Sequence, residues 1–169
     1  MAGSLQKSSP HLGSIINRFQ KTAPFTHLRE LLERERLAEI PICGMAGSSS
    51  SILLSCLVKE KDRPIIAIVA DSDEAANLYD DLVFLLSEDE VTYYPSRMVS
   101  PFEFRSPSAE ISGQRLATLS KLSNGTAGVI VTSIAALIEP TISKIDFSSS
   151  QLYLKAGQEM EIDSLAERL

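Results

Sequence analysis

The stretch that decides the fold reads Ile-Pro-Ile-Cys-Gly-Met-Ala-Gly-Ser-Ser-Ser-Ser and spans residues 40–51. A short apolar run comes first, then a glycine turn with Gly44 and Gly47, then a helix predicted to begin near Ser50. That order is typical of a phosphate-binding loop, in which glycine, four free residues, glycine, lysine and serine or threonine follow one another. Counted from Gly44, Ser50 takes the place of the lysine and Ser51 takes the place of the hydroxyl residue.

The missing lysine changes what such a loop can do. Backbone N–H groups and a helix N-terminus attract any anion. The lysine adds the charge that reaches the terminal phosphates, and the hydroxyl helps to hold magnesium. Ser50 has no charge, and Ser49 has a side chain where glycine favours close phosphate approach. We therefore expect a degenerate loop, with weak anion binding at most and no ATP turnover. True nucleotide binding and a purely structural turn are the two alternatives.

Composition excludes several classes of function. The 169 residues are 44% hydrophobic and 22% charged, which is enough to bury a core. A net charge of -6 without a Lys/Arg cluster is unfavourable for nucleic-acid binding by this chain alone, and favours a protein partner. No apolar run approaches the roughly 20 residues that span a bilayer. No secretory signal is recognisable, so we expect no membrane association and a cytoplasmic location.

The sequence indicates no catalytic or metal-binding residues. Cys43 and Cys56 flank the glycine turn, and we expect both to be reduced, buried and hydrophobic in role. His11 and His27 lie far away in the N-terminal segment, so neither a zinc site nor a histidine-activated serine can be assembled. We therefore expect no metal and no cofactor in this chain.

Apolar runs and helical periodicities alternate along the chain. They predict an α/β fold with a parallel sheet flanked by helices, like that of P-loop NTPases. The run at 65–69 suits a strand covered on both faces. Asp71, followed by Glu74, predicts a helix cap and not a catalytic carboxylate. The predicted strands are 40–43, 65–69, 91–94, 129–132 and 151–155.

The same patterns predict three regions. Residues 1–38 form an N-terminal segment with one or two amphipathic helices, and residues 39–150 form the α/β domain. Residues 151–169 begin a second domain, with a turn at 156–158 and a helix from Asp163. Because an apolar helix begins there without a following partner, we expect the intact protein to be longer.

Several motifs together resemble one known family, from residue 40 to residue 169. The matching stretches are 44–51, 65–69 with Asp71 and Ala75, 94–97, 100–103, 106–107, 114–116 with Leu119 and Leu122, 129–133 with Ala136 and Leu137, and 155–158. In this order and spacing they resemble the N-terminal region of the bacterial transcription-repair coupling factors (Mfd), whose opening module is similar to the excision-repair protein UvrB. The resemblance implies a fold like domain 1a of UvrB.

The resemblance also implies a function. UvrB is an ATPase and would be expected to have lysine at the place of Ser50, so Ser50 favours the coupling factor over an active UvrB-like helicase. The intact protein would be an ATP-driven DNA translocase that uses ATP and magnesium in a C-terminal motor. It would remove RNA polymerase stalled at a lesion and recruit UvrA, with this module masked at rest. The UvrA surface would lie mainly on the second domain, of which only 151–169 belongs to this chain, so no UvrA-binding residue can be assigned.

Three arginines lie near a proline-rich segment at 95–107. For Arg97, Arg105 and Arg115 we expect ion pairs or packing within the domain, in preference to contacts with a partner. A further hypothesis remains, in which the chain is a generic doubly wound domain that holds a small anion at residues 44–51.

Overall fold

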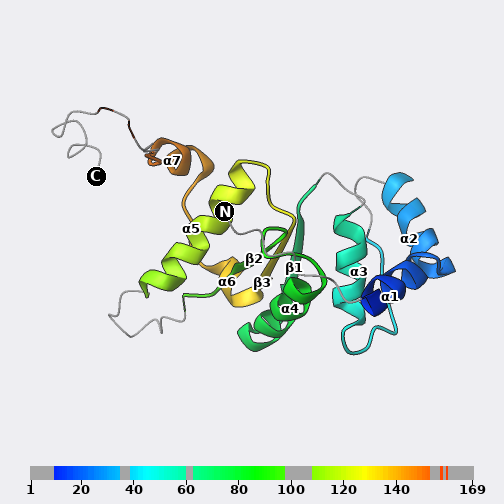
Figure 1. Cartoon of the computed structure of the whole chain (residues 1–169). Coiled ribbons are helices and arrows are strands. Elements are labelled where there is room, and N and C mark those ends of the chain that lie inside the picture. Colours follow the sequence, from blue (N-terminus) through cyan, green and yellow to red (C-terminus); the bar gives the residue numbers. More distant parts are fainter. Residues whose placement is uncertain are drawn as a thin grey trace. The chain divides into compact units, whose positions relative to one another are not determined.

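A computed structural model of the chain describes residues 10–34, 39–59, 63–97 and 108–152, together with Gly157 and Glu159. The chain divides into two compact units, residues 1–139 and 140–169. The first unit is an α/β structure with a three-stranded parallel sheet flanked by helices, which confirms the predicted fold class (Figure 1). The boundaries predicted for three regions remain predictions.

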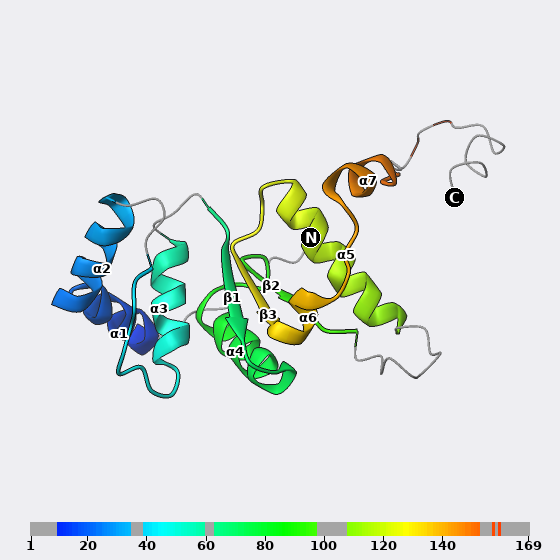
Figure 2. The same cartoon turned by 180° about the vertical axis from the view of Figure 1, so that it is seen from behind.

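The first unit contains six helices and three strands among its described residues. They are α1 (Pro10–Gln20), α2 (Ala23–Arg34), α3 (Ser49–Val58), β1 (Ile65–Val69), α4 (Ser72–Leu85), β2 (Val91–Tyr94), α5 (Ala109–Ser123), β3 (Val129–Ser133) and α6 (Ile134–Ile138). The strand order is β1-β3-β2, and both pairings are parallel (Figure 2). Val129 is the partner of Ile65 on one side and of Val91 on the other.

The central strand β3 is buried along its whole length, as its apolar sequence predicts. On one face of the sheet, Val129 and Val131 pack with Leu82 of α4. On the other face, Ile130 packs with Ala136 of α6, and Leu119 of α5 adds to this second cluster. Burial of these side chains removes apolar surface from water and is the main stabilising term for the unit.

The prediction that the 65–69 strand is covered on both faces is wrong. β1 is an edge strand in the described sheet, and Ile66 and Ile68 are 52% and 54% exposed. Only the side chains that alternate with them point into the α4 side of the core, with Ala67 buried there. A continuous apolar run therefore indicated a strand correctly but not how much of it is covered.

The strand predicted at 40–43 is also wrong. Residues 39–46 have no regular secondary structure, and Ile42 is 47% exposed. Pro41 cannot donate a backbone hydrogen bond to a ladder, which disfavours pairing at this point. Ile40 and Met45 pack instead in a separate cluster with side chains of α1, α2 and α3. The glycine turn therefore does not follow a strand end, as the pattern predicted.

The N-terminal helices confirm the predicted amphipathic segment. Ile16 of α1 and the pair Phe25 and Leu28 of α2 are buried, and they form one cluster with Leu53 and Cys56 of α3. Their apolar residues recur at helical spacing, which places them on one face of each helix. This cluster is separate from the two clusters on the sheet.

The cap predicted at Asp71 is confirmed. Its carboxylate accepts a hydrogen bond of 2.8 Å from the Glu74 N–H, and the Glu74 carboxylate accepts one of 3.2 Å from the Ala70 N–H. The pair resembles a capping box, except that Glu74 reaches one residue beyond the cap. A carboxylate used in this way stabilises the start of α4, so the structure gives Asp71 a structural role.

Replacing Asp71 by alanine is expected to lower the free energy of unfolding by about 1 kcal/mol, because an orphan N–H of the first helical turn loses its acceptor. Asp71→Asn keeps an acceptor and is expected to lower the free energy of unfolding by only a few tenths of about 1 kcal/mol. Urea unfolding of the two variants and the wild type measures the difference. Equal losses for both variants would contradict the cap.

The second unit contains one described helix, α7 (Lys144–Ser149), which the sequence patterns did not predict. Ser143 caps it by accepting from the Asp146 N–H at 3.2 Å, and Phe147 is its buried residue. Gln151 and Leu152 do not form the start of the predicted strand. The rest of that strand, the predicted helix from Asp163 and the segment 98–107 with Arg105 lie outside the described residues. Within the described part of the chain, no helix is long and apolar enough to cross a membrane.

Candidate functional site

The glycine turn keeps part of the backbone geometry of a phosphate loop. Gly44 and Gly47 have φ values of +80° and +53°, the left-handed region in which glycine is strongly favoured. Helix α3 begins at Ser49, one residue before the predicted start. A left-handed turn therefore leads directly into a helix N-terminus, where backbone N–H groups lack intrahelical partners.

One N–H group of the turn already has an acceptor within the turn. The Ala46 N–H donates to the Ser49 hydroxyl oxygen at 2.7 Å, and the Ser49 N–H donates back to the Ala46 carbonyl at 3.2 Å. Ser48, the N-cap residue of α3, makes no side-chain capping bond. The turn is thus closed by a reciprocal pair of bonds between residues 46 and 49.

The two positions that matter most for nucleotide binding differ in their surroundings. Ser50, in the lysine position, is exposed and carries no charge. Ser51, in the magnesium position, is only 2% exposed, and its hydroxyl donates to Asp81 Oδ2 of α4 at 3.0 Å. The Ser51 hydroxyl therefore links α3 to α4.

The space beside the turn is apolar. A cavity of about 640 Å³ lies between α1, α2, α3 and residues 40–45, and its lining includes Phe19, Phe25, Ile42 and Cys43. No Lys or Arg occurs from residue 39 to residue 58. The residues that line the cavity include no Lys or Arg, so it lacks a permanent cation that could attract a phosphate. Cys43 is exposed, contrary to prediction, whereas Cys56 is buried as predicted.

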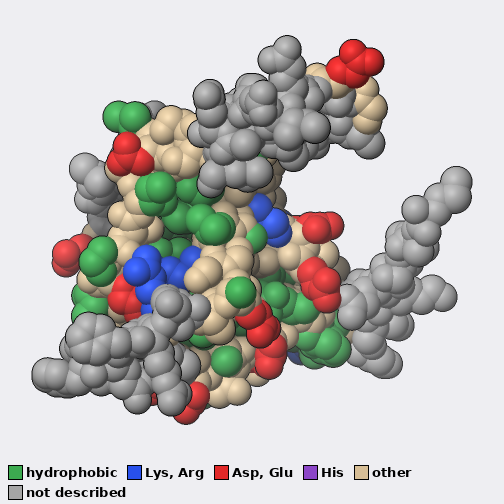
Figure 3. Space-filling view, turned by 90° about the vertical axis from the view of Figure 1, so that its left-hand side faces the viewer, with side chains coloured by type: hydrophobic (Ala, Val, Ile, Leu, Met, Phe, Trp, Pro, Cys, Tyr) green, Lys and Arg blue, Asp and Glu red, His purple; other side chains and the backbone are tan. Residues whose placement is uncertain are grey.

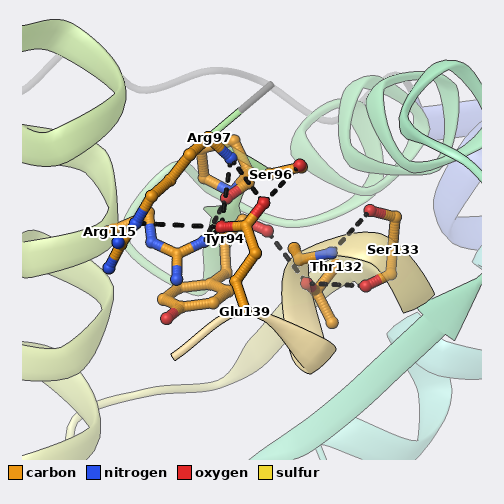
Figure 4. A network of polar contacts seen from close by, with 9 residues as sticks. Tyr94, Ser96, Arg97, Arg115, Thr132, Ser133 and Glu139 are labelled. Atoms are coloured by element: carbon orange, nitrogen blue, oxygen red, sulfur yellow. Dashed lines mark hydrogen bonds and ion pairs between the residues drawn. The ribbon is translucent and has the colours of Figure 1, made fainter. Parts of the chain in front are cut away.

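A second group of polar side chains lies at the carboxyl end of β2. The Glu139 carboxylate accepts from the Ser96 hydroxyl at 2.6 Å, from the Arg97 N–H at 2.9 Å and from Arg115 Nη1 at 2.8 Å (Figure 4). Arg115 Nη1 also donates to the Pro95 carbonyl at 2.8 Å. One carboxylate thus connects the end of α6, the end of β2 and helix α5.

Arg115 is an internal cation with a structural environment. Its side chain is 6% exposed, and its guanidinium carbon lies 4.1 Å from the centre of the Tyr94 ring. Arg97 Nε lies 3.8 Å from the same Glu139 carboxylate. The ion pairing and packing predicted for Arg97 and Arg115 are confirmed. Buried Arg115 Nη2 has no hydrogen-bond partner among the described residues.

Two tyrosines of the core have raised pKa values. Burial raises the pKa of Tyr79 above its usual 10.0, with further contributions from Glu88 and Asp80. Burial also raises the pKa of Tyr93, assisted by Asp73. Their ring centres lie 5.6 Å apart, between α4 and β2. Both therefore remain neutral phenols near pH 7, and both pack against the core on the α4 side of the sheet.

The described residues bring together no metal site. No group of three or more His, Cys, Asp or Glu side chains in this part of the chain is arranged to hold a metal ion. The face of the molecule in Figure 3 shows basic side chains next to acidic and hydrophobic ones, without an extended basic patch. Among the coloured side chains of that face, the basic ones therefore form no continuous track for a phosphate backbone.

Sequence reasoning missed the two carboxylates on which these arrangements depend. Asp81 lies 30 residues from Ser51, and Glu139 lies 24 residues from Arg115. Neither acid belongs to a motif, so only the folded structure reveals the pairing. A polar residue within the apolar periodicity of α4 was the one available signal for Asp81.

The parallel sheet, the flanking helices and the glycine turn before α3 define an α/β domain consistent with the P-loop-like, UvrB-type class. No protein-family model matches the chain. It is 33% identical over 135 residues, 80% of its length, to the transcription-repair-coupling factor of Bacillus subtilis (strain 168). It is 31% identical over 109 residues to that of Rickettsia prowazekii (strain Madrid E). It is 20% identical over 143 residues to that of Staphylococcus aureus (strain bovine RF122 / ET3-1).

The chain therefore belongs to the transcription-repair coupling factor family (Mfd), which confirms the resemblance predicted from its motifs. The match covers 80% of the chain but only 12% of the Bacillus subtilis protein. The chain thus corresponds to a small part of such a protein.

Proposed function

We propose that the chain is a non-catalytic, UvrB-like module of a transcription-repair coupling factor. In the intact protein it would help to recruit UvrA to RNA polymerase stalled at DNA lesions, and it would be masked at rest. Family membership supports this assignment. The observation that carries the non-catalytic part is uncharged, exposed Ser50 in the lysine position of the glycine turn.

The proposal separates two activities within one protein. ATP and magnesium would serve a motor elsewhere in the intact chain, together with DNA and RNA polymerase contacts, and this module would hold no cofactor. Its net charge of -6 fits contacts with proteins better than contacts with DNA. Its place of action would be the cytoplasm.

The alternative, an active ATP-binding domain of a UvrB-like helicase, needs a cation near the turn. Residues 39–58 supply neither lysine nor arginine, and the hydroxyl in the magnesium position is bonded to Asp81. These two observations favour the non-catalytic module.

Capture of the intact protein on immobilised UvrA tests the recruitment. We expect weak capture of the resting protein, and strong capture when stalled RNA polymerase on DNA and ATP are supplied. Deletion of residues 1–169 is expected to weaken capture, because it removes the opening of the second domain and the module that carries it, while continued ATP hydrolysis shows that the motor is folded. Ser50→Ala serves as a matched control that leaves capture unchanged. Undiminished capture of the deletion variant would contradict the proposal.

A further inference from the structure

The glycine turn of residues 44–51 does not fit the ATP–magnesium that its pattern would hold, and the lysine is only one of the reasons. A phosphate loop aims free backbone N–H groups at the phosphate oxygens. In this turn the Ala46 N–H already donates to the Ser49 hydroxyl at 2.7 Å. The side chain in the position of the second glycine therefore acts as an internal acceptor and takes up one backbone donor of the turn.

The magnesium position is changed in a different way. Ser51 is nearly fully buried, and its hydroxyl is held by Asp81 at 3.0 Å. A hydroxyl that donates to a carboxylate of α4 is committed to the contact between two helices. The same contact places a negative charge beside the first turn of α3, where a phosphate would have to bind.

The segment that carries the turn does not offset this charge. The segment 39–58 contains Glu39 and no basic residue, and the adjoining cavity is lined mainly by apolar side chains. A lysine introduced at position 50 would therefore meet an occupied N–H and a nearby carboxylate.

We propose that Ser49 and Asp81, together with the loss of the lysine, are the residues that close this loop to nucleotides. Ser49 occupies one backbone donor of the turn, and Asp81 both holds the Ser51 hydroxyl and would repel phosphate. The inference rests on the proposed function, because it explains how a non-catalytic module excludes nucleotide. In this role the segment is structural, because the Ser51 hydroxyl joins α3 to α4 through Asp81.

Stepwise restoration of the loop in the 169-residue chain tests the assignment. The variants are Ser50→Lys alone, Ser49→Gly with Ser50→Lys, and these two combined with Asp81→Asn. Asparagine keeps an acceptor for the Ser51 hydroxyl and removes the charge. Each is titrated with ATP and magnesium by calorimetry. We expect no measurable binding of ATP by Ser50→Lys. The triple variant is expected to bind ATP at least about tenfold more tightly than Ser50→Lys, which is a difference of about 1.4 kcal/mol in binding free energy.

Thermal melting of each variant supplies the control for folding. If the triple variant does not melt cooperatively, the double variants S49G/S50K and S50K/D81N are compared with Ser50→Lys instead. Each double variant must then bind ATP more tightly than Ser50→Lys does. Equal affinity of Ser50→Lys and the more complete variants would overturn the assignment. A folded set in which none binds would overturn it as well. Both results would leave the proposed function standing, whereas ATP binding by the wild type would contradict the proposed function itself.

Discussion

Replacing Glu139 by alanine is expected to lower the free energy of unfolding by about 3 kcal/mol, which is near the lower limit for removing one partner of a buried ion pair. Arg115 would keep its charge in a position where only 6% of its side chain is exposed. The Ser96 hydroxyl and the Arg97 N–H would lose their acceptor at the same time. We take the lower limit because the Glu139 side chain is 22% exposed, and water can replace part of what is lost.

Glu139→Gln is the matched control for this substitution. Its amide oxygen can still accept one or two of the three hydrogen bonds, but the charge opposite Arg115 is removed. We expect a smaller loss, about half that of alanine, because neutral hydrogen bonds are weaker than charge-assisted ones. Urea unfolding followed by circular dichroism gives both values. A loss below about 0.5 kcal/mol for Glu139→Ala, the usual range for an ordinary surface substitution, would contradict the role assigned to this carboxylate.

Replacing Gly128 by alanine is expected to cost about 3 kcal/mol, at the upper end for overpacking, because a rigid backbone atom stands in the way. A Cβ at this position would lie 2.4 Å from the Glu90 carbonyl oxygen. That oxygen accepts from the Val129 N–H at 2.8 Å, and the Gly128 carbonyl accepts from the Ile65 N–H at the same distance. The added methyl group would therefore separate the strands where all three begin.

Gly113→Ala provides a control with the same chemical change. Gly113 lies within α5, and a Cβ there would meet no atom within 4 Å. Alanine is the better helix former by about 1 kcal/mol, so this variant is expected to be more stable than the wild type. The two substitutions thus have opposite expected signs in the same unfolding experiment. A neutral or stabilising Gly128→Ala would contradict the close approach of β2 and β3.

The sequence predicted secondary structure correctly where the interactions that stabilise an element join residues close together in the chain. Asp71 and Glu74 are three residues apart and bond to neighbouring backbone groups, so a cap at α4 could be read directly. The apolar runs of β1 and β3 likewise indicated strands. The family could be recognised because several short motifs follow one another in a fixed order and spacing along the sequence.

Other features depend on contacts that no local pattern encodes. The position of β1 at the edge of the described sheet depends on which strands join it, so the exposure of Ile66 and Ile68 could not be predicted. Pro41 was the local signal against a strand at 40–43, and it outweighed the apolar residues on either side. Once that strand is absent, Cys43 has no sheet to cover it, which accounts for its exposure.

The candidate loop shows both limits together. Its glycine frame and its missing lysine are visible in eight consecutive residues, 44–51. The closure by Ser49 and Asp81 is visible only in the structure, because one bond lies within the turn and the other joins residues 30 apart. The sequence motif therefore indicates the type of loop, whereas the hydrogen bonds within the folded loop indicate whether it can bind a nucleotide.

Calorimetric titration of the wild-type chain with ATP and magnesium is the most direct test of the central claim. The structure leads us to expect no binding heat at ATP concentrations up to about 1 mM, which corresponds to a binding free energy weaker than about -4.1 kcal/mol. A saturable signal with a micromolar dissociation constant would contradict the account, because it would show that a turn without a lysine still seats a triphosphate.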